Sequence, residues 1–391
     1  MRKAYITILT FALTCSCSDK GETPQDEKEQ TVTEIAVLKG MRTNKAPELS
    51  EGEAKDLTKD DFDKGSLLYI SQRGTSMTPD FSENSNNCYV YQYQENREAD
   101  WDHEYNFFPN KEKTHIINWS TIKQNGPVGN AFWLFAMYFP VDNQIRFGVE
   151  KNQTDLKDFQ KSDIMGAYHA TSSLFTRLRF RLHHLMVYLK VTLYVPVAKP
   201  DEDGNGYSGF KEDAFHKAIV QNAITNFTID WTANRSSDVD PPLTQNNSST
   251  RSDIIMHKRD EQLKEETINV KDFYDNPSYM IDNDDVRVYH FDVIFPGNQN
   301  FGDNFLRFQF RTPGEVSDKP ILKNYYFSAS QLITNNDYTY SLTQGTLQHL
   351  RLYLPRYGNQ TILVGANIIP WTDASTEMTV TKDENKPEES Q

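Results

Sequence analysis

The sequence predicts an all-β chain folded as two β-sandwich domains in tandem. Its 20 Tyr and 23 Phe are residue types that favour strands. Apolar and polar residues alternate over several short segments bounded by Gly and Pro, whereas helical periodicity is weak along the whole chain. The length of 391 residues exceeds what one hydrophobic core normally serves, so two domains are expected.

Residues 1–16 have the pattern of a secretion signal. Arg2 and Lys3 precede an uncharged, mainly apolar run over residues 4–14, which is shorter than the roughly 20 residues that span a bilayer. The run leads into LTCSC at residues 13–17, which resembles the lipobox of bacterial lipoproteins. Cys17 fits the lipidated position better than Cys15, because small Ser16 precedes it. The alternative is an ordinary cleaved signal with chance cysteines.

The charge and the cysteines restrict the partners. Loss of Arg2 and Lys3 with the signal changes the formal net charge from −14 to −16. Nucleic acid and anionic headgroups repel such a chain, so neither is an expected partner, and acyl chains on Cys17 would supply the membrane attachment. Apart from acylated Cys17, Cys88 is then the single cysteine of the mature chain, so no intramolecular disulfide is expected.

The first predicted domain covers residues 32–172. Polar, acidic residues 17–31 precede it and read as a tether, because such a composition buries too little surface to fold. Val32 to Leu38 (VTEIAVL) is the first strand candidate, and Ser66 to Ser71 is the next. The nine apolar residues Ala131 to Phe139, stopped by Pro140, suit a fully buried strand.

The second predicted domain covers residues 173–381 and begins with a long alternating segment, Arg177 to Val195. Apolar residues take even positions up to Leu182 and odd positions from Leu185. A one-residue slip turns every side chain to the other face, so a bulge or break at His183 and His184 is expected. These histidines are read as positional rather than as metal ligands.

Further strands follow the same pattern, and residues 382–391 form a second polar tail. The strand candidates are 286–295, 306–310, 350–354 and 361–369, and the best short helix candidate is Asp213 to Ala223.

One loop matches a calcium-binding pattern. Asp201, Asp203, Asn205 and Glu212 stand where D-x-[DN]-x-[DN]-G-x5-E places oxygen ligands, and Gly206 permits the tight turn. A strand and a proline precede the loop, however, where the usual motif has a helix. An acidic hairpin loop explains the same residues, so no cofactor is predicted and calcium remains an alternative.

Signatures of catalysis are missing. The sequence has no second histidine spaced for a zincin site after His103-Glu104, no G-x-S-x-G elbow and no cysteine pair spaced for zinc. Gly204, Gly206 and Gly209 spell G-x-G-x-x-G, but acidic residues precede them and no βαβ unit surrounds them. We therefore predict a protein that is not an enzyme.

Several short segments, in their order and spacing, resemble the fimbrillin family, the pilins of type V pili in Bacteroidetes-type bacteria. These segments are IAVLKGMRT at 35–43, SDIMGA at 162–167, FRLHHL at 180–185, FDVIFP at 291–296 and IIPW at 368–371. The resemblance implies two transthyretin-like β-sandwich domains and a subunit exported to the outer membrane surface as a lipoprotein. It also implies that an Arg- or Lys-directed protease removes the first strand, and that a strand of a neighbouring subunit fills the groove.

Carried over to this chain, the resemblance makes Val32 to Leu38 the removable strand and Arg42, or less readily Lys39, the cut. The expected function is a structural or adhesive fimbrial subunit that binds other pilin subunits by strand addition and surface ligands of host or bacterial cells. Two alternatives remain. The strand stays in place, as in an anchor subunit, or the chain is a glycan-binding surface lipoprotein that stacks sugars on aromatics such as Trp101, Tyr105, Trp119 and Tyr207.

Overall fold

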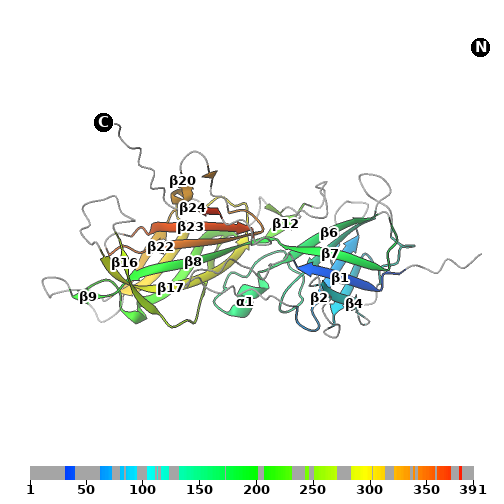
Figure 1. Cartoon of the computed structure of the whole chain (residues 1–391), viewed down its shortest axis with the longest axis horizontal. Helices are drawn as coiled ribbons and strands as arrows, with labels where there is room; N and C mark the ends of the chain where they lie inside the picture. Colours follow the sequence, from blue (N-terminus) through cyan, green and yellow to red (C-terminus); the bar gives the residue numbers. More distant parts are fainter. Residues whose placement is uncertain are drawn as a thin grey trace, which may run out of the picture.

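The fold is that of a computed structural model, which describes residues 31–39, 62–72, 80–82, 85–94, 104–110, 112, 116–122, 132–171, 173–200, 207–230, 243–245, 251–270, 283–301, 303–312, 321–334, 338–339, 342–356, 359–370 and 378–380. Two β-rich bodies lie end to end along the long axis of the chain (Figure 1). The prediction of an all-β chain is confirmed, since the described residues are mainly strands and contain one short α-helix, α1, Leu156–Lys161. No helix within this described part is long and apolar enough to cross a membrane.

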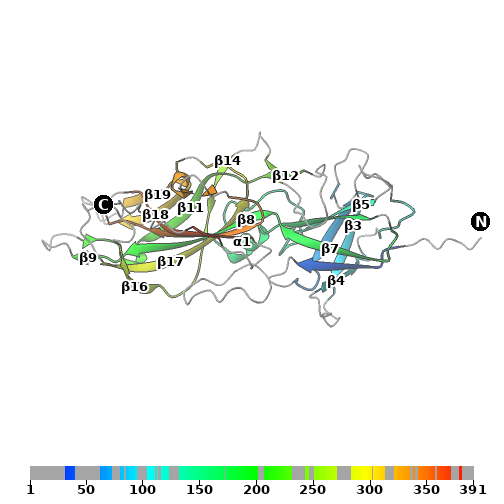
Figure 2. The same cartoon turned by 45° about the horizontal axis from the view of Figure 1, so that its top comes forward.

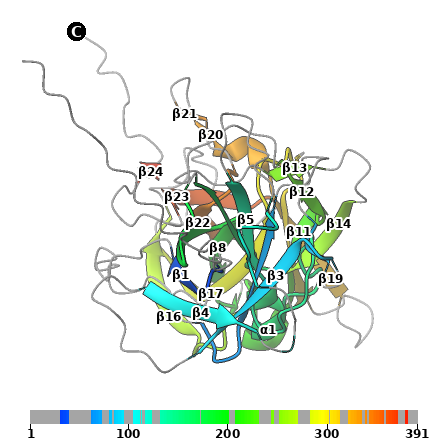
Figure 3. The ribbon, with the colours of Figure 1, turned by 90° about the vertical axis from the view of Figure 1, so that its right-hand side faces the viewer.

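The first body is a closed barrel of seven strands. Around the barrel their order is β1, β4, β3, β2, β5, β6, β7 and back to β1. Figure 3 looks onto this barrel from its free end. The strands are β1 (Glu34–Lys39), β2 (Leu67–Gln72), β3 (Cys88–Tyr93), β4 (Glu104–Pro109), β5 (Phe132–Tyr138), β6 (Met165–Thr171) and β7 (Arg177–His184).

Barrel closure differs from the expected pair of transthyretin-like sandwiches, which is not confirmed. A sandwich leaves sheet edges open, whereas here β1 pairs with β4 on one side and with β7 on the other. Alternate residues of each strand point inward and form one core, as Leu178, Phe180 and Leu182 do on β7. The predicted domain limits at residues 172 and 173 stay a prediction.

The second body packs two sheets around one core (Figure 2). The four-stranded sheet has the order β14-β11-β18-β19, and the larger one has the order β15-β17-β8-β22-β23-β24, with β16 also paired to β17. Its strands are β8 (Met186–Pro196), β11 (Phe215–Ile224), β14 (Arg251–Ile255), β15 (His257–Lys258), β16 (Lys264–Asn269), β17 (Asn283–Pro296), β18 (Leu306–Thr312), β19 (Ile321–Phe327), β22 (Thr346–Tyr353), β23 (Ile362–Pro370) and β24 (Met378–Val380).

Smaller elements complete the second body. The two-stranded pairs are β9 (Lys199–Pro200) with β10 (Tyr207–Ser208), β12 (Phe227–Ile229) with β13 (Leu243–Gln245), and β20 (Ile333–Thr334) with β21 (Tyr338–Thr339). Short 3₁₀ helices cover Glu212–Ala214 and Ala329–Leu332. The helix expected over Asp213 to Ala223 is wrong: β11 occupies most of that segment, because β14 and β18 pair with its two edges.

The chain passes from the barrel to the second body through Leu185. β7 ends at His184 and β8 begins at Met186, so the break expected from the change of phase lies directly after the histidine pair. The two strands face different cores, that of the barrel and that of the second body. His184 lies buried with its Nδ1 2.6 Å from Oδ1 of buried Asp163, a contact between polar side chains at the junction.

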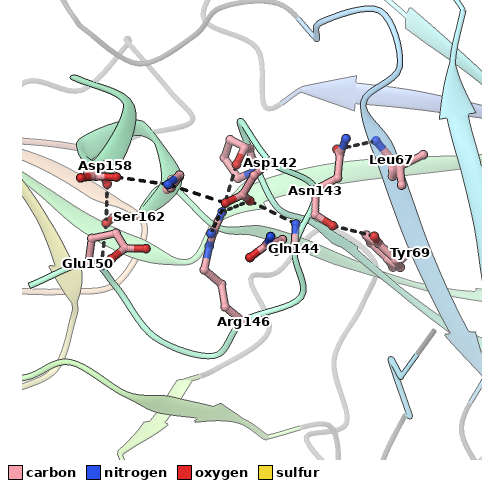
Figure 4. A network of polar contacts seen from close by, with 11 residues as sticks. Leu67, Tyr69, Asp142, Asn143, Gln144, Arg146, Glu150, Asp158 and Ser162 are labelled. Atoms are coloured by element: carbon pink, nitrogen blue, oxygen red, sulfur yellow. Dashed lines mark hydrogen bonds and ion pairs between the residues drawn. The ribbon is translucent and has the colours of Figure 1, made fainter. Parts of the chain in front are cut away.

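Residues 140–162, which we call the connector, tie the barrel to the second body. Asn143 has a positive φ of 55°, a conformation that Asn tolerates better than most residues. From this turn its Oδ1 accepts a hydrogen bond from the backbone N–H of Leu67 (2.8 Å), and its carbonyl accepts one from the Tyr69 hydroxyl (2.6 Å) (Figure 4). The connector thereby holds β2, which lies opposite β1 in the barrel order.

Ion pairs and capping bonds fix the connector internally (Figure 4). The Arg146 guanidinium donates to both carboxylate oxygens of Asp142, at 2.9 and 3.1 Å, and to the Pro140 carbonyl at 3.0 Å. The Ser162 hydroxyl donates to the Asp158 carbonyl and accepts from the Glu150 N–H. A forked guanidinium–carboxylate pair is geometrically specific, so the turn has one preferred shape.

Gln153 joins the connector to the larger sheet of the second body. Its side chain is 0% exposed, its Nε2 donates to the Ile294 carbonyl (2.7 Å) and its Oε1 accepts from the Ile294 N–H (2.9 Å). Its own N–H donates to the Ile255 carbonyl (2.9 Å). The pairing of β15 with β17 begins at His257, which lies opposite Asp292. At Ile294, beyond this end of β15, the side-chain amide of Gln153 takes the place of a paired backbone group.

A buried ion pair lies on the same sheet. Asp292 is 0% exposed and accepts two hydrogen bonds from Arg259, from Nε at 2.6 Å and from Nη2 at 2.8 Å. The Tyr188 hydroxyl donates a third at 2.6 Å. Burial acts to lower the pKa of Arg259, but the hydrogen bonds that it donates to Asp292 and the charge of that carboxylate raise the pKa overall. The three side chains therefore form one buried hydrogen-bonded group.

Two histidines share the neighbouring threonine. The Thr192 hydroxyl lies 3.1 Å from Nδ1 of His290 and 2.8 Å from Nε2 of His349. Burial, followed by the charges of Arg351 and Lys190, lowers the pKa of His349 to about 3. Burial also lowers the pKa of His290. Both imidazoles are thus held neutral near pH 7.

Candidate functional site: the first strand and its groove

β1 is the strand that closes the barrel (blue in Figure 1). It runs antiparallel to β4, with Ile35 opposite Phe107, and parallel to β7, with Glu34 opposite Arg177. Paired backbone groups line both of its edges. Without β1, β4 and β7 would each expose an unpaired edge, which is a template for another strand.

The inward side chains of β1, together with Val32 just before it, fill the barrel core. Val32, Ile35 and Val37 are each 0% exposed and pack in one cluster with residues that include Phe107 and Phe180. Full burial of such a side chain contributes about 1.5–3 kcal/mol, hence about 5–9 kcal/mol for the three. A groove without them would present apolar pockets at alternate positions.

The residues before β1 are also fixed. The Val32 N–H donates to the Ile117 carbonyl, and the Thr33 N–H donates to the Thr176 carbonyl, both at 2.9 Å. The Tyr91 hydroxyl donates to the Val32 carbonyl at 2.9 Å and accepts from the Ile117 N–H at 3.3 Å. Burial raises the pKa of Tyr91. The hydroxyl therefore stays protonated and serves as a donor from the core.

The outward side chains of β1 meet a polar surface. Glu34 and Arg177 form an ion pair, with Oε1 and Nε 3.3 Å apart. The same guanidinium donates through Nη2 to Oδ1 of Asn106 on β4, at 3.3 Å. The alternation of Arg177 with apolar residues predicts a strand but not these contacts, because they join segments separated by 71 and 143 positions (177 − 106 and 177 − 34).

The predicted processing residues lie at or beyond the limits of the described chain. Lys39 is the last residue of β1, and its backbone pairs with Leu182 of β7. Arg42 and the lipidation candidate Cys17 lie outside the described residues. Lipidation at Cys17 and cleavage at Arg42 or Lys39 stay predictions.

The calcium loop falls largely outside the described residues as well. Asp201, Asp203 and Asn205 belong to that part, whereas Glu212 is an exposed residue that begins a 3₁₀ helix. The described residues contain no group of three or more His, Cys, Asp or Glu able to hold a metal ion. Calcium binding at this loop stays a prediction.

The aromatic residues suggested for sugar stacking do not form one surface among the described residues. Trp119 is only 4% exposed, and its indole N–H donates to the Phe175 carbonyl at 2.8 Å. Tyr105 packs edge-on against Phe62 at 4.9 Å between ring centroids. Trp101 lies outside the described residues. The described part of the chain thus favours the β1 groove as its candidate site.

Comparisons with known proteins find solved structures that resemble this chain at low sequence identity. No family model matches the chain, and no curated protein matches it. A Bacteroides uniformis protein, provisionally assigned to cell adhesion, is 13% identical with a TM-score of 0.45 and covers 87% of this chain and 97% of its own. The tip fimbrial protein Mfa3 from Porphyromonas gingivalis, truncated at its C-terminus, is 9% identical with a TM-score of 0.34, over 79% and 95%.

A fimbrial assembly protein from Parabacteroides distasonis is 10% identical with a TM-score of 0.36, over 89% of this chain and 98% of its own. Two of these three neighbours are fimbrial proteins, and the third is provisionally assigned to cell adhesion. Their TM-scores lie below 0.5, so this likeness assigns no function to the chain.

Proposed function

We propose that this chain is a non-catalytic structural or adhesive subunit of a cell-surface fimbria. In this proposal it is exported as a lipoprotein acylated at Cys17 and held at the outer membrane. A protease then cuts after Arg42 or Lys39 and releases the first strand. A strand of another subunit enters the groove, and the assembled fimbria presents the chain to ligands on host or bacterial cells.

The placement of β1 is the observation that carries the proposal. β1 is the first strand of the barrel in chain order, so one backbone cut between β1 and β2 separates it covalently from the other six. Each of those six is joined to the chain at both ends. Release of β1 would leave two strand edges and the pockets of three buried aliphatic side chains, which is the surface that strand addition requires.

A sequence match within the chain supports exchange between copies. Residues 33–39 read TEIAVLK, and residues 376–382 read TEMTVTK. Both have Glu followed by an apolar residue, a small residue and Val. Met378–Val380 of the second segment form β24, which pairs with the edge of β23 over three residues. The segment thus has the alternation of β1 in its sequence, and its residues 378–380 lie on a sheet edge.

Limited trypsin digestion of the mature chain, residues 17–391, tests the proposal. We expect trimming at Arg42 or Lys39, identified by N-terminal sequencing, followed by ladders that resist detergent and dissociate on heating. The matched control replaces by Gln every basic residue from the end of β1 up to β2, because trypsin cuts after each: Lys39, Arg42, Lys45, Lys55, Lys59 and Lys64. The removable strand then stays attached and no ladder should form. A trimmed protein that remains strictly monomeric contradicts the proposal.

A further inference from the structure

A side chain of β7 crosses the outer face of β1. Arg177 lies opposite Glu34 in the parallel register, and Asn106 lies opposite Ala36 in the antiparallel register. The Arg177 guanidinium contacts both Glu34 and Asn106, so it reaches from β7 over β1 to β4. We call the Arg177–Asn106 contact the latch.

Ala36 lies under the latch. It points away from the barrel core, since its neighbours Ile35 and Val37 belong to that core, yet it is 0% exposed. An outward residue is normally open to solvent, so its burial reflects cover by adjacent side chains. Asn106 and Arg179 are its direct neighbours on β4 and β7. A side chain larger than serine or threonine would have to displace this cover.

Arginines line the outer face of β7 beside the latch. Arg177, Arg179 and Arg181 alternate along the outer face of β7, and all three are exposed. Glu34 is the acidic partner that β1 brings to the first of them, with 19% of its side chain exposed against 40% for Arg177. A strand with a basic residue at the position of Glu34 would place like charges directly opposite each other, which disfavours pairing.

We infer that Arg177 and Asn106 select the strand that occupies the groove, accepting an acidic residue opposite Arg177 and a small residue two positions later. This inference rests on the proposed function, because it concerns the same groove. Two positions of the C-terminal segment meet the requirement: Glu377 corresponds to Glu34, and Thr379 corresponds to Ala36. The latch thus discriminates between strands by their outward side chains, and the pockets discriminate between them by their inward side chains.

Substitutions in the uncut mature chain test the contacts themselves. Ala36→Leu should lower the hydrogen-exchange protection of the β1 amides roughly five- to one-hundred-fold, since overpacking has a cost of that order. Ala36→Ser is the matched control and should leave protection nearly unchanged. Glu34→Lys should lower protection up to about five-fold, and Arg177→Glu in the same chain should restore it. Equal protection in Ala36→Leu and Ala36→Ser would overturn the steric requirement.

Peptide exchange tests the selection of a partner. A site for a specific protease replaces residues 43–49 of the mature chain, the chain is cut there, and a labelled peptide of residues 31–39 is added in excess. Fluorescence anisotropy follows its entry. The Ala36→Leu peptide should bind at least about five-fold more weakly, and the Glu34→Lys peptide up to about five-fold more weakly. Arg177→Glu protein should regain the Glu34→Lys peptide, and Asn106→Ala protein should regain the Ala36→Leu peptide.

The outcomes separate the two proposals. If the unchanged peptide enters and both altered peptides enter equally well, the latch is wrong and strand exchange stands. If the unchanged peptide never enters, the groove accepts no strand, and both the proposed function and the latch are overturned.

Discussion

Replacement of Gln153 measures how much one side chain of the connector contributes to the free energy of unfolding through its contact with the second body. Gln153→Ala removes both partners that this amide gives to the backbone of Ile294. Each buried backbone group left unpaired has a cost of about 1–3 kcal/mol, so we expect a loss of about 2–6 kcal/mol in the free energy of unfolding. That is a large fraction of the stability of an ordinary domain.

Gln153→Glu is the sharper variant. At pH 7 a carboxylate still accepts from the Ile294 N–H but cannot donate to the Ile294 carbonyl, and its charge is buried. We expect it to be at least as destabilising as Gln153→Ala at pH 7. Burial raises the pKa of such a carboxyl above its unfolded value, so the deficit should shrink as the pH falls and the protonated acid regains a donor.

Urea unfolding followed by tryptophan fluorescence measures both variants, and hydrogen exchange at the Ile294 amide reports the broken contact directly. Lys151→Ala, an exposed change in the same segment, serves as control and should stay within about 0.5 kcal/mol of the unchanged protein. If Gln153→Glu unfolds at the same urea concentration as the unchanged protein at pH 7, the role assigned to this amide is refuted.

Three further predictions concern buried polar groups. Asp292→Ala leaves the Arg259 charge buried without its carboxylate and should destabilise the protein by about 3–5 kcal/mol in urea, whereas a loss below 1 kcal/mol would contradict this. The pKa of His349 is about 3 in the folded chain, so between about pH 6.5 and 3 this histidine is neutral when folded and protonated when unfolded. The free energy of unfolding should therefore fall as the pH falls through that range. His349→Gln should flatten this part of the profile of urea midpoint against pH, and an unchanged slope would count against it. Tyr91→Phe removes the hydrogen bond to the Val32 carbonyl and should lower the stability of the β1 pairing by about 0.5–1.5 kcal/mol. Faster hydrogen exchange of the β1 amides measures this loss. Unchanged exchange would show that the backbone pairing of β1 with β4 and β7 holds the strand without this bond.

Local patterns in the sequence predict several of the longer strands. The segments expected over 66–71, 131–139 and 306–310 correspond to β2, β5 and β18, because alternation and apolar runs are local properties. The change of phase after Leu182 also predicts the break at the junction. In each case the information lies within about ten neighbouring residues.

Contacts between distant segments are what the sequence does not predict. Closure of the barrel depends on parallel pairing of β1 with β7, across more than 140 positions (177 − 34 = 143), and no local pattern encodes it. Asn143 and Gln153 look like ordinary polar loop residues, although both bond backbone groups of other elements. Trp119 looks like a surface aromatic in a polar segment and is a core residue. Burial of these residues follows from the tertiary fold.

The passage through Leu185 has a consequence for a chain that is pulled at both ends. β7 and β8 follow each other along the long axis, and β8 is hydrogen-bonded to β17 and β22 on its two sides (Figure 1). Backbone hydrogen bonds lie across the strands, so a lengthwise force shears many of them at once instead of opening them one by one. The link between barrel and second body is therefore strongest along the direction in which a filament built end to end would carry tension.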